Sequence, residues 1–304
     1  MSTIQTTSHF IPLGDEQLHL KRIWSNPEGA PVLMIHGSIE SGNIFYSKSM
    51  KGLAPYLAKQ GLDVYVADLR GRGLSTPTVS RQATNTQQQA ITEEIPAFVK
   101  QIQQLRGTET PIHAIAHSWG GVLLLAYLAR FPQASFESMV FLATKRSISV
   151  RNLKKYFAID LMWNLVGRTL TSLYGFLPAI QLKIGSANES ANVYSDCRKW
   201  VYSLYEWKGV NDGFDYLQAF KTAQNIPPTL YMTGINEFYL GHQDDVKRLM
   251  KEVDNPTDKF MLLSKTNGHK KDYGHIDICT AKEGTNDHFP IIRNWMVQQK
   301  VAQQ

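Results

Sequence analysis

The sequence has few cysteines, and neither lies in a spacing typical of a metal site or a redox pair. Only Cys197 and Cys279 are present among 304 residues, and they are far apart. HExxH motifs and dense Asp/His clusters are also absent. We therefore expect two ordinary buried thiols in a reducing compartment, with no metal ion and no cofactor.

Targeting and membrane-spanning signals are missing as well. The first ten residues, MSTIQTTSHF, have neither a basic region nor an apolar core of the kind that a secretory signal needs. The most apolar long stretch, residues 156–184, is too interrupted to cross a bilayer. Its interruptions are Asp160, Asn164, Arg168 and Pro178. We expect a cytoplasmic protein.

Charge of one sign is not concentrated enough to indicate a nucleic-acid partner. The net charge is +6, but the lysines and arginines are scattered and no nucleic-acid-binding motif accompanies them. The densest basic run consists of Lys145, Arg146, Arg151, Lys154 and Lys155. We interpret this run as a solvated face; the alternatives are that it meets an anionic substrate or supports weak association with a membrane surface.

The pattern of apolar segments predicts an α/β fold. Residues 9–13 and 19–23 alternate like the two strands of a hairpin. Short apolar runs of the kind that form buried strands occupy residues 31–36, 63–69, 112–117, 138–143, 229–234 and 259–264. Helical patterns lie between them, at residues 47–60, 86–105, 122–131 and 243–253, and a final one follows the last strand at residues 289–299. This alternation predicts a mostly parallel sheet flanked by helices, with right-handed crossovers.

The alternation of strands and helices stops between residues 144 and 225. This segment is helical in pattern and rich in aromatic side chains. We interpret it as a helical cap inserted over the ends of the strands, with residues 1–143 and 226–304 forming the core domain. Most of its aromatic side chains are expected to hold the cap together rather than to contact a ligand.

A turn that carries a single serine is central to the functional interpretation. Residues 112–121, IHAIAHSWGG, run from an apolar strand through Ser118 into a helical pattern that begins at Val122. A nucleophile at such a turn has a strained backbone, so small residues are needed two positions before and after it. Ala116 and Gly120 meet that need, although glycine is usual at both positions. The alternative is that Ser118 only caps the helix.

A base and an acid for this serine follow later in the chain. A serine hydroxyl needs a base to take its proton and a carboxylate to orient that base. Glu237 follows the strand at 229–234, and His275 follows the last strand within DYGHID. Asp244 and Asp245 are rivals for the acid, but they lie where a helix is expected to begin. His269 is a second histidine in the same loop as His275, and we expect it to be solvated.

Five motifs in this order make the chain resemble an α/β-hydrolase-fold serine hydrolase of the esterase and lipase type. They are VLMIHGS, ADLRGRGLS, AIAHSWGG, LYMTGINE and YGHID. The resemblance implies that Ser118 is the nucleophile, His275 the base and then the acid, and Glu237 the orienting carboxylate. It also implies an oxyanion hole formed by the backbone N–H groups of Ser38 and Trp119.

The resemblance predicts an enzyme that cleaves carboxylic esters through an acyl-enzyme on Ser118. The expected substrate is a small molecule with a lipid-like or aromatic portion, because the cap is large and apolar. Thioesterase or acyltransferase activity uses the same residues and remains an alternative. A non-catalytic protein that holds a small ligand in the same fold is the alternative of another class. The oligomeric state is not indicated by the sequence.

Overall fold

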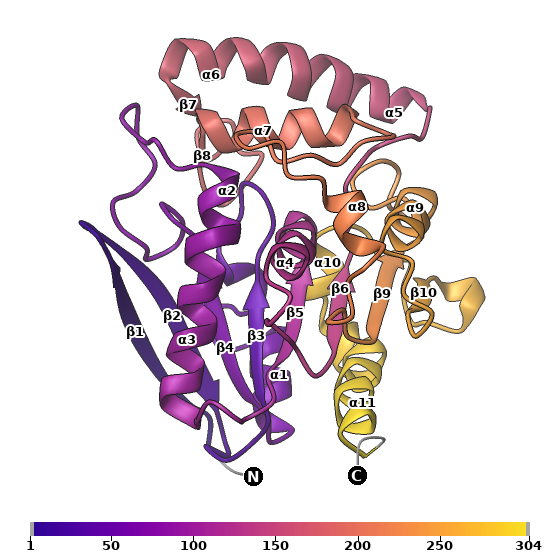
Figure 1. Ribbon diagram of the computed structural model, residues 1–304. Coiled ribbons are helices and arrows are strands. Elements are labelled where there is room, and N and C mark those ends of the chain that lie inside the picture. Colours follow the sequence, from indigo (N-terminus) through magenta and orange to yellow (C-terminus); the bar gives the residue numbers. More distant parts are fainter. Residues whose placement is uncertain (1–2, 302–304) are drawn as a thin grey trace.

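The computed structural model describes residues 3–301, and in this part of the chain eight strands form one sheet (Figure 1). The strand order is β1-β2-β4-β3-β5-β6-β9-β10. The strands are β1 (Gln5–Leu13), β2 (Glu16–Trp24), β3 (Pro31–Ile35), β4 (Asp63–Asp68), β5 (His113–His117), β6 (Met139–Leu142), β9 (Thr229–Gly234) and β10 (Lys259–Leu263). From β4 to β10 all neighbours pair in parallel, which confirms the predicted mostly parallel sheet.

The opening hairpin is also confirmed, and it is longer than predicted. Strands β1 and β2 pair antiparallel over nine residues each, and β2 pairs antiparallel with β4. The hairpin therefore forms one edge of the sheet. The rest of the sheet has the parallel arrangement in which the carboxyl ends of the strands meet at one edge, the usual place for a site in α/β proteins.

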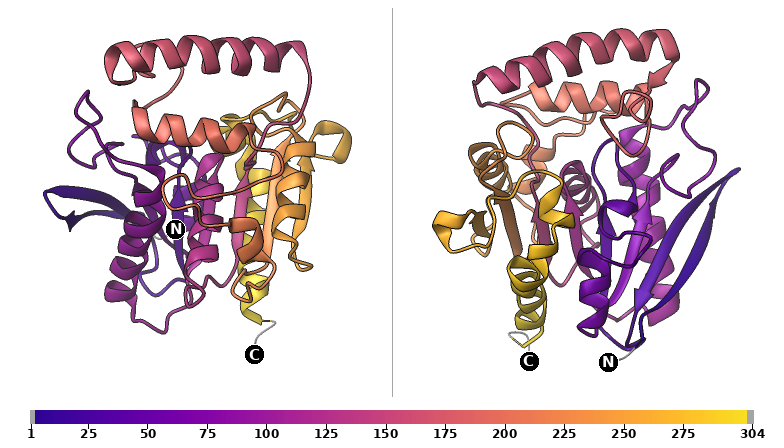
Figure 2. Two further views of the ribbon diagram at one scale, coloured as in Figure 1. Left: turned by 45° about the horizontal axis from the view of Figure 1, so that its top comes forward. Right: turned by 180° about the vertical axis from the view of Figure 1, so that it is seen from behind.

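Side chains alternate between two apolar layers, one on each face of the sheet. In β3, Leu33 and Ile35 contact one core, whereas Val32 and Met34 contact the other. The first layer is covered by α3 (Ile95–Arg106) and α4 (Trp119–Arg130), and the second by α1 (Leu53–Lys59) and α11 (His288–Val301). Figure 2 shows α1 and α11 on the rear face. Strands buried on both faces need continuous apolar sequences, and for this reason the sequence predicted these strands.

The predicted helix at residues 47–60 is correct only in its second half. Helix α1 begins at Leu53, after a turn in which Gly52 has φ of +120°. A side chain there would also come within 2.6 Å of the backbone oxygen of Phe45. Gly61, with φ of +88°, follows the end of the helix, a place where glycine is common because it adopts positive φ without strain. The positive φ of Gly52 prevents a regular helix from beginning earlier.

The remaining core helices follow the predicted order. A capping box at Thr86 starts the continuous helical segment of α2 (Gln87–Gln89), the π-helical turn η2 (Ala90–Glu94) and α3. Helix α9 (Gln243–Val253) has the predicted bounds. Shorter elements are η1 (Gly42–Ile44), η4 (Lys265–Asn267), α10 (Asp277–Thr280) and η5 (Lys282–Asn286).

The helices of residues 144–225 lie over the end of the sheet. Segments α5 (Leu153–Lys155), η3 (Tyr156–Gly167) and α6 (Arg168–Tyr174) form one long rod, and α7 (Ala191–Tyr202) lies between this rod and the sheet (Figures 1 and 2). The short strands β7 (Phe176–Leu177) and β8 (Glu189–Ser190) pair antiparallel, and α8 (Tyr216–Phe220) packs against α4. The division of the chain into core and cap at these boundaries remains a prediction. Among residues 3–301, no helix has both the length and the apolar character needed to cross a membrane.

Candidate active site

Ser118 occupies a strained turn between β5 and α4. Its φ of 49° and ψ of −120° are unusual for a residue with a side chain. The backbone N–H of Ser118 donates to the carbonyl oxygen of Leu142 on the neighbouring strand at 2.8 Å, which fixes the turn to the sheet. The serine side chain makes no capping hydrogen bond to the helix. The interpretation of Ser118 as a simple side-chain cap is therefore wrong.

The space around the turn explains why small residues are needed beside Ser118. A Cβ atom on Gly120 would lie 2.6 Å from the backbone oxygens of both Ile35 and His36. The first turn of α4 therefore packs closely against the end of β3 at Gly120. Ala116, the departure from the usual pattern, is fully buried in β5. The turn accommodates its methyl group.

The structure brings the three residues of the predicted triad together. His275 Nε2 lies 3.1 Å from Ser118 Oγ, and His275 Nδ1 lies 2.6 Å from Glu237 Oε1. A carboxylate can only accept, so Nδ1 carries a proton and Nε2 is left free to accept the serine proton. Glu237 is only 3% exposed. This is the geometry that a general base and its orienting acid require.

The rival carboxylates do not reach His275. Asp244 and Asp245 lie in the first turn of α9, as the sequence indicated. Asp245 is buried and accepts hydrogen bonds from the backbone N–H and the hydroxyl of Ser149. Asp244 is exposed. Glu237 is therefore the acidic residue that contacts the histidine.

The loop after β3 lies directly against Ser118. A Cβ atom on Gly37 would be 2.9 Å from Ser118 Cβ. The next residue, Ser38, lines the same cavity as Ser118 and Trp119. Trp119 is the first residue of α4, where backbone N–H groups have no partner within the helix. This placement suits the predicted oxyanion hole, whose two donors would be the N–H groups of Ser38 and Trp119.

Ser38 is also connected to the segment above the sheet. Its hydroxyl donates to Glu189 Oε2 at 3.0 Å, and Glu189 is paired with the Arg72 guanidinium. Glu189 is fully buried, and Arg72 is 4% exposed. The buried ion pair therefore anchors the loop that carries Ser38 to strand β8.

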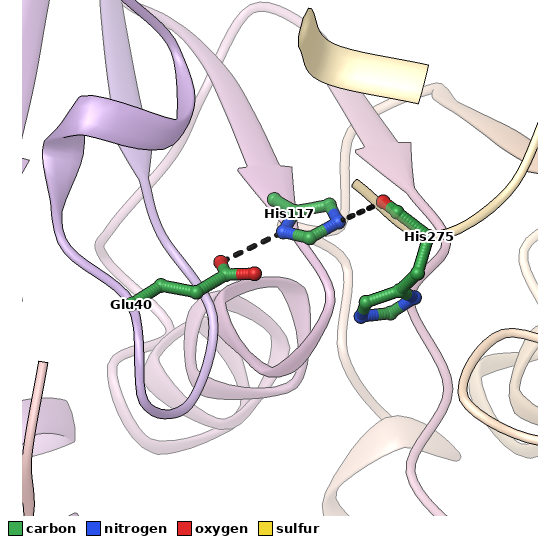
Figure 3. Close-up of side chains that lie close together, drawn as sticks. All are labelled: Glu40, His117 and His275. Carbon is green, nitrogen blue, oxygen red and sulfur yellow. Dashed lines mark hydrogen bonds and ion pairs between the residues drawn. The ribbon is translucent and has the colours of Figure 1, made fainter. Parts of the chain in front are cut away.

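A second acid and histidine, Glu40 and His117, lie beside His275, and the sequence did not reveal their role (Figure 3). Glu40 Oε2 accepts a hydrogen bond from His117 Nδ1 at 2.8 Å and another from the backbone N–H of Gly37 at 2.8 Å. His117 Nε2 lies 2.8 Å from the backbone oxygen of His275. One buried pair thus connects the loop after β3, the residue before Ser118 and the backbone of His275. An acid three residues after Gly37 was the available sequence signal.

The hydrogen bonds and the charges of this pair together favour an ionic state. The carbonyl of His275 can only accept, so Nε2 of His117 carries a proton, and Nδ1 carries a second proton when Glu40 is ionised. Burial opposes charge on both groups, but the charge of His117 and its hydrogen bond lower the pKa of Glu40 to about 2. Likewise, the negative charge of Glu40 outweighs burial and raises the pKa of His117. The positive charge behind His275 is therefore neutralised by a partner.

The same three side chains have a spacing that a metal ion could accept. Ligand atoms of Glu40, His117 and His275 lie within 4.8 Å of one another. However, both nitrogens of His117 already contact protein acceptors, and those of His275 contact Glu237 and Ser118. A metal ion would have to displace these hydrogen bonds. We interpret the cluster as a hydrogen-bond network.

Three further polar side chains, those of His36, Asp68 and His269, are held by hydrogen bonds within the protein. His36 Nε2 accepts from the backbone N–H of Leu69 at 3.1 Å, and burial lowers the pKa of His36 to about 4. Asp68 accepts from the N–H groups of Gly42 and Leu74, which fixes the glycine-rich turn. The expectation of a solvated His269 is wrong, because its Nδ1 contacts Asp287 at 2.8 Å.

Both cysteines are buried, as expected, and Cys197 lies in the wall of the cavity. Burial raises the pKa of the Cys197 thiol to about 12, so it stays protonated at neutral pH. A thiol in this state is a weak nucleophile. We assign it a packing role in the cavity wall.

A large, mainly apolar cavity opens beside Ser118 and His275. Its volume is about 540 Å³, which is in the range of small-molecule sites. Apolar side chains from the core and from the overlying helices line it, among them Ile148, Ile159, Trp163, Ile184, Val201 and Leu240. The cavity can therefore hold an apolar group next to Ser118.

The basic run is not the solvated face that was expected. Arg146 is fully buried and holds Glu252 and the backbone oxygens of Trp200, Ser203 and Glu206. Lys145 is 4% exposed and lines the cavity. Only the later members of the run, such as Arg151 and Lys154, are exposed. The first two positive charges therefore have interior roles.

Comparisons with known proteins agree with the fold. A family model described as the alpha/beta hydrolase fold matches residues 30–170. Proline iminopeptidase from Lactobacillus delbrueckii subsp. lactis is 26% identical over 148 residues, which cover 47% of this chain and 46% of that protein. The chain thus spans about half the length of the curated relatives it matches.

Solved structures match over nearly the whole chain. A soluble variant of monoglyceride lipase from Saccharomyces cerevisiae has a TM-score of 0.70 at 14% identity and covers 97% of this chain and 95% of that one. A thermophilic esterase from Thermogutta terrifontis has a TM-score of 0.60 at 15% identity and covers 97% and 99%. The chain is therefore a protein of the α/β-hydrolase fold, as its motifs indicated.

Proposed function

We propose that this protein is a serine hydrolase that cleaves carboxylic esters. The observation that carries the proposal is the connected series Ser118, His275 and Glu237, with contacts of 3.1 Å and 2.6 Å. The apolar cavity beside Ser118 supports an ester with a lipid-like or aromatic portion. No cofactor is needed for this chemistry.

The first half of the reaction forms an acyl-enzyme. Ser118 Oγ attacks the ester carbonyl carbon while His275 Nε2 takes the hydroxyl proton. The negative charge that develops on the carbonyl oxygen would be stabilised by the N–H groups of Ser38 and Trp119. The C–O bond to the alcohol then breaks, and His275 gives its proton to the leaving oxygen.

The second half restores the enzyme. Water attacks the acyl carbon while His275 takes one of its protons, and the bond to Ser118 Oγ breaks with return of that proton to the serine. The acid product leaves. Glu237 holds the histidine ring in the correct tautomer and stabilises its positive form in both halves.

Replacement of the nucleophile tests the proposal. We expect Ser118→Ala to lower kcat/KM for short and medium p-nitrophenyl esters by at least about 10³-fold. A fluorophosphonate probe should label the native protein and not the variant. Unchanged hydrolysis in Ser118→Ala would refute the assignment, and failure of the folded native protein to react with the probe would favour the non-catalytic ligand-binding alternative.

Related chemistries differ only in the acceptor or the bond that breaks. Thioester hydrolysis and acyl transfer use the same three residues, and a panel of esters, thioesters and amides separates them. The relative named proline iminopeptidase raises peptide hydrolysis as a further candidate. The buried ammonium of Lys145 in this cavity disfavours a substrate with a cationic amino terminus, because like charges repel. We therefore place esters first.

We also propose that residues 144–225 act as a cap whose outer face associates weakly with membrane surfaces. The rod of α5, η3 and α6 exposes large apolar side chains, namely Leu153, Tyr156, Phe157, Met162, Leu165 and Leu173. The exposed bases Arg151 and Lys154 lie at the beginning of this rod. Apolar and basic groups together favour binding to anionic lipid.

A further inference from the structure

Lys145 is a buried lysine within the cavity that contains Ser118. It lies three residues after the end of β6, and its side chain is almost completely removed from solvent. Its ammonium lies 5.7 Å from the centre of the Trp119 ring, which borders the same cavity. Lys145 therefore lines the proposed substrate pocket.

Among the described residues, none provides a hydrogen bond or an ion pair to Lys145. The neighbouring buried residue, Arg146, differs in this respect. Its guanidinium donates hydrogen bonds to the carboxylate of Glu252 and to backbone carbonyls. A buried charge without a partner is costly, so lysine is rarely buried in this state unless something else supplies the partner.

The carboxylates that attract the Lys145 ammonium already have other hydrogen-bond partners. Glu237 and Asp245 attract the Lys145 ammonium from a distance, but Glu237 bonds His275 and Asp245 bonds Ser149. The carboxylate of Glu40, which also borders the cavity, is held by His117 and Gly37. The counter-charge for Lys145 is therefore not supplied by these groups.

We propose that Lys145 binds an anionic group of the substrate, so that the preferred substrates are esters that also carry a carboxylate. This inference rests on the proposed ester hydrolysis and names the substrate class for the same site. A single carboxylate fits better than a doubly charged phosphate, because Lys145 is the only lysine or arginine among the described residues that line the cavity. The rest of the wall is mainly apolar and suits the carbon chain between the carboxylate and the ester.

A bound carboxylate would also remove the cost of the buried ammonium. Burial lowers the pKa of Lys145. A carboxylate within hydrogen-bond distance favours the charged form and offsets that effect. Selectivity then arises because a neutral ester of the same shape leaves the ammonium unpaired.

The test compares matched esters. Monophenyl adipate and phenyl hexanoate differ by a carboxylate on the acyl portion, and 3-carboxyphenyl hexanoate places the carboxylate on the alcohol portion. We expect the native enzyme to favour at least one carboxylate ester over phenyl hexanoate by about 10- to 100-fold in kcat/KM. Lys145→Met should abolish this preference, and Lys145→Arg should retain part of it. Lys145→Gln replaces the methionine variant if that protein does not fold.

Lys154→Met is the matched control, because it removes the same charge from an exposed position outside the cavity. It should keep the native selectivity. The inference is overturned if neither carboxylate ester is preferred, if Lys145→Met keeps the preference, or if Lys154→Met loses it equally.

A measurement without hydrolysis separates this inference from the proposed function. Calorimetric binding of hexanoate should be stronger than that of hexanamide in the native protein and equal in Lys145→Met. If the fluorophosphonate probe fails to label Ser118 but this difference is found, the anion site stands and the proposed hydrolysis does not. If labelling occurs and the difference is absent in both binding and kinetics, the anion site is wrong.

Discussion

Glu40 and His117 form a buried ion pair, with 2.8 Å between Oε2 and Nδ1, directly behind the proposed catalytic histidine. The two rings, His117 and His275, have centroids 4.7 Å apart. A lone positive charge at that distance would oppose the imidazolium that His275 must form during the reaction. Glu40 removes this opposition and at the same time holds the Gly37 N–H in place.

Replacement of Glu40 should therefore damage both stability and turnover. We expect Glu40→Gln to lower the free energy of unfolding by about 3–5 kcal/mol near pH 6, because it leaves His117 without its ionic partner. For the protein that remains folded, kcat should fall by about 10-fold or more through misplacement of Gly37 and His275. Denaturant unfolding and ester kinetics at a temperature below both transitions measure the two effects. Native turnover in Glu40→Gln would contradict the positioning role.

The same pair predicts a pH dependence of stability. The pKa of Glu40 is about 2 in the folded protein, below its ordinary 4.5, so its contribution is complete above about pH 4.5 and is lost as pH falls toward 2. The pKa of His117 is raised above 6.5, so its contribution is complete below pH 6.5 and is lost as pH rises through the folded value. The stability difference between native protein and Glu40→Gln should be largest between pH 4.5 and 6.5. An equal difference at pH 3 would show that the pair is not ionic.

Glu237 can be distinguished from the acidic residues that compete with it in the sequence. We expect Glu237→Gln to lower kcat by about 10³- to 10⁴-fold, because an amide favours the wrong tautomer of His275. Asp244→Asn, at an exposed position on α9, should leave kcat unchanged. Steady-state kinetics on one ester decides between them. A loss confined to Asp244→Asn would reassign the acid.

The close contact at Gly120 predicts a steric effect. Gly120→Ala places a methyl group 2.6 Å from the backbone oxygens of Ile35 and His36, and we expect a loss of about 1–3 kcal/mol in the free energy of unfolding. Ala116→Gly is the matched change on the other side of Ser118 and should cost no more than about 1 kcal/mol. Thermal unfolding followed by circular dichroism checks both variants. Equal losses of stability in the two variants would show that the backbone around Gly120 moves to accommodate the methyl group at little cost.

Membrane association predicts a dependence on lipid charge and salt. The native protein should bind vesicles that contain phosphatidylserine more strongly than vesicles of phosphatidylcholine, and added salt should weaken that binding. Phe157→Glu, on the exposed rod, should reduce binding, whereas Leu74→Glu, at an exposed position of the core, should not. Co-sedimentation measures all three proteins. Vesicle binding that is unchanged by added salt and by Phe157→Glu would refute this proposal.

Local pattern was enough to predict the sheet and the order of the site residues. Strand β9 and helix α9 have the bounds that the sequence indicated, because buried strands and amphipathic helices leave a strong periodic signal. Ser118, Glu237 and His275 could be placed at strand ends for the same reason, and the structure finds them in contact.

Contacts between distant segments could not be predicted in this way. Glu40 and His117 are 77 positions apart, and although an acid follows closely after Gly37, the local sequence does not show which residue it pairs with. Lys145 and Arg146 are adjacent in a run that looks like a charged surface, yet both are buried. Their environment is set by the helices that fold over them, including α7, and these contacts appear only in three dimensions.

The hydrogen bond between Ser38 and Glu189 makes the position of the loop after β3 depend on the segment above the sheet. Ser38 carries a proposed oxyanion donor, whereas Glu189 belongs to β8 above the sheet, and Ser190 beside it donates to the backbone oxygen of Asn85. A displacement of β8 would therefore break this hydrogen bond and separate Arg72 from its buried partner. By thermodynamic linkage, a ligand that holds β8 in place would also stabilise the loop that carries Ser38.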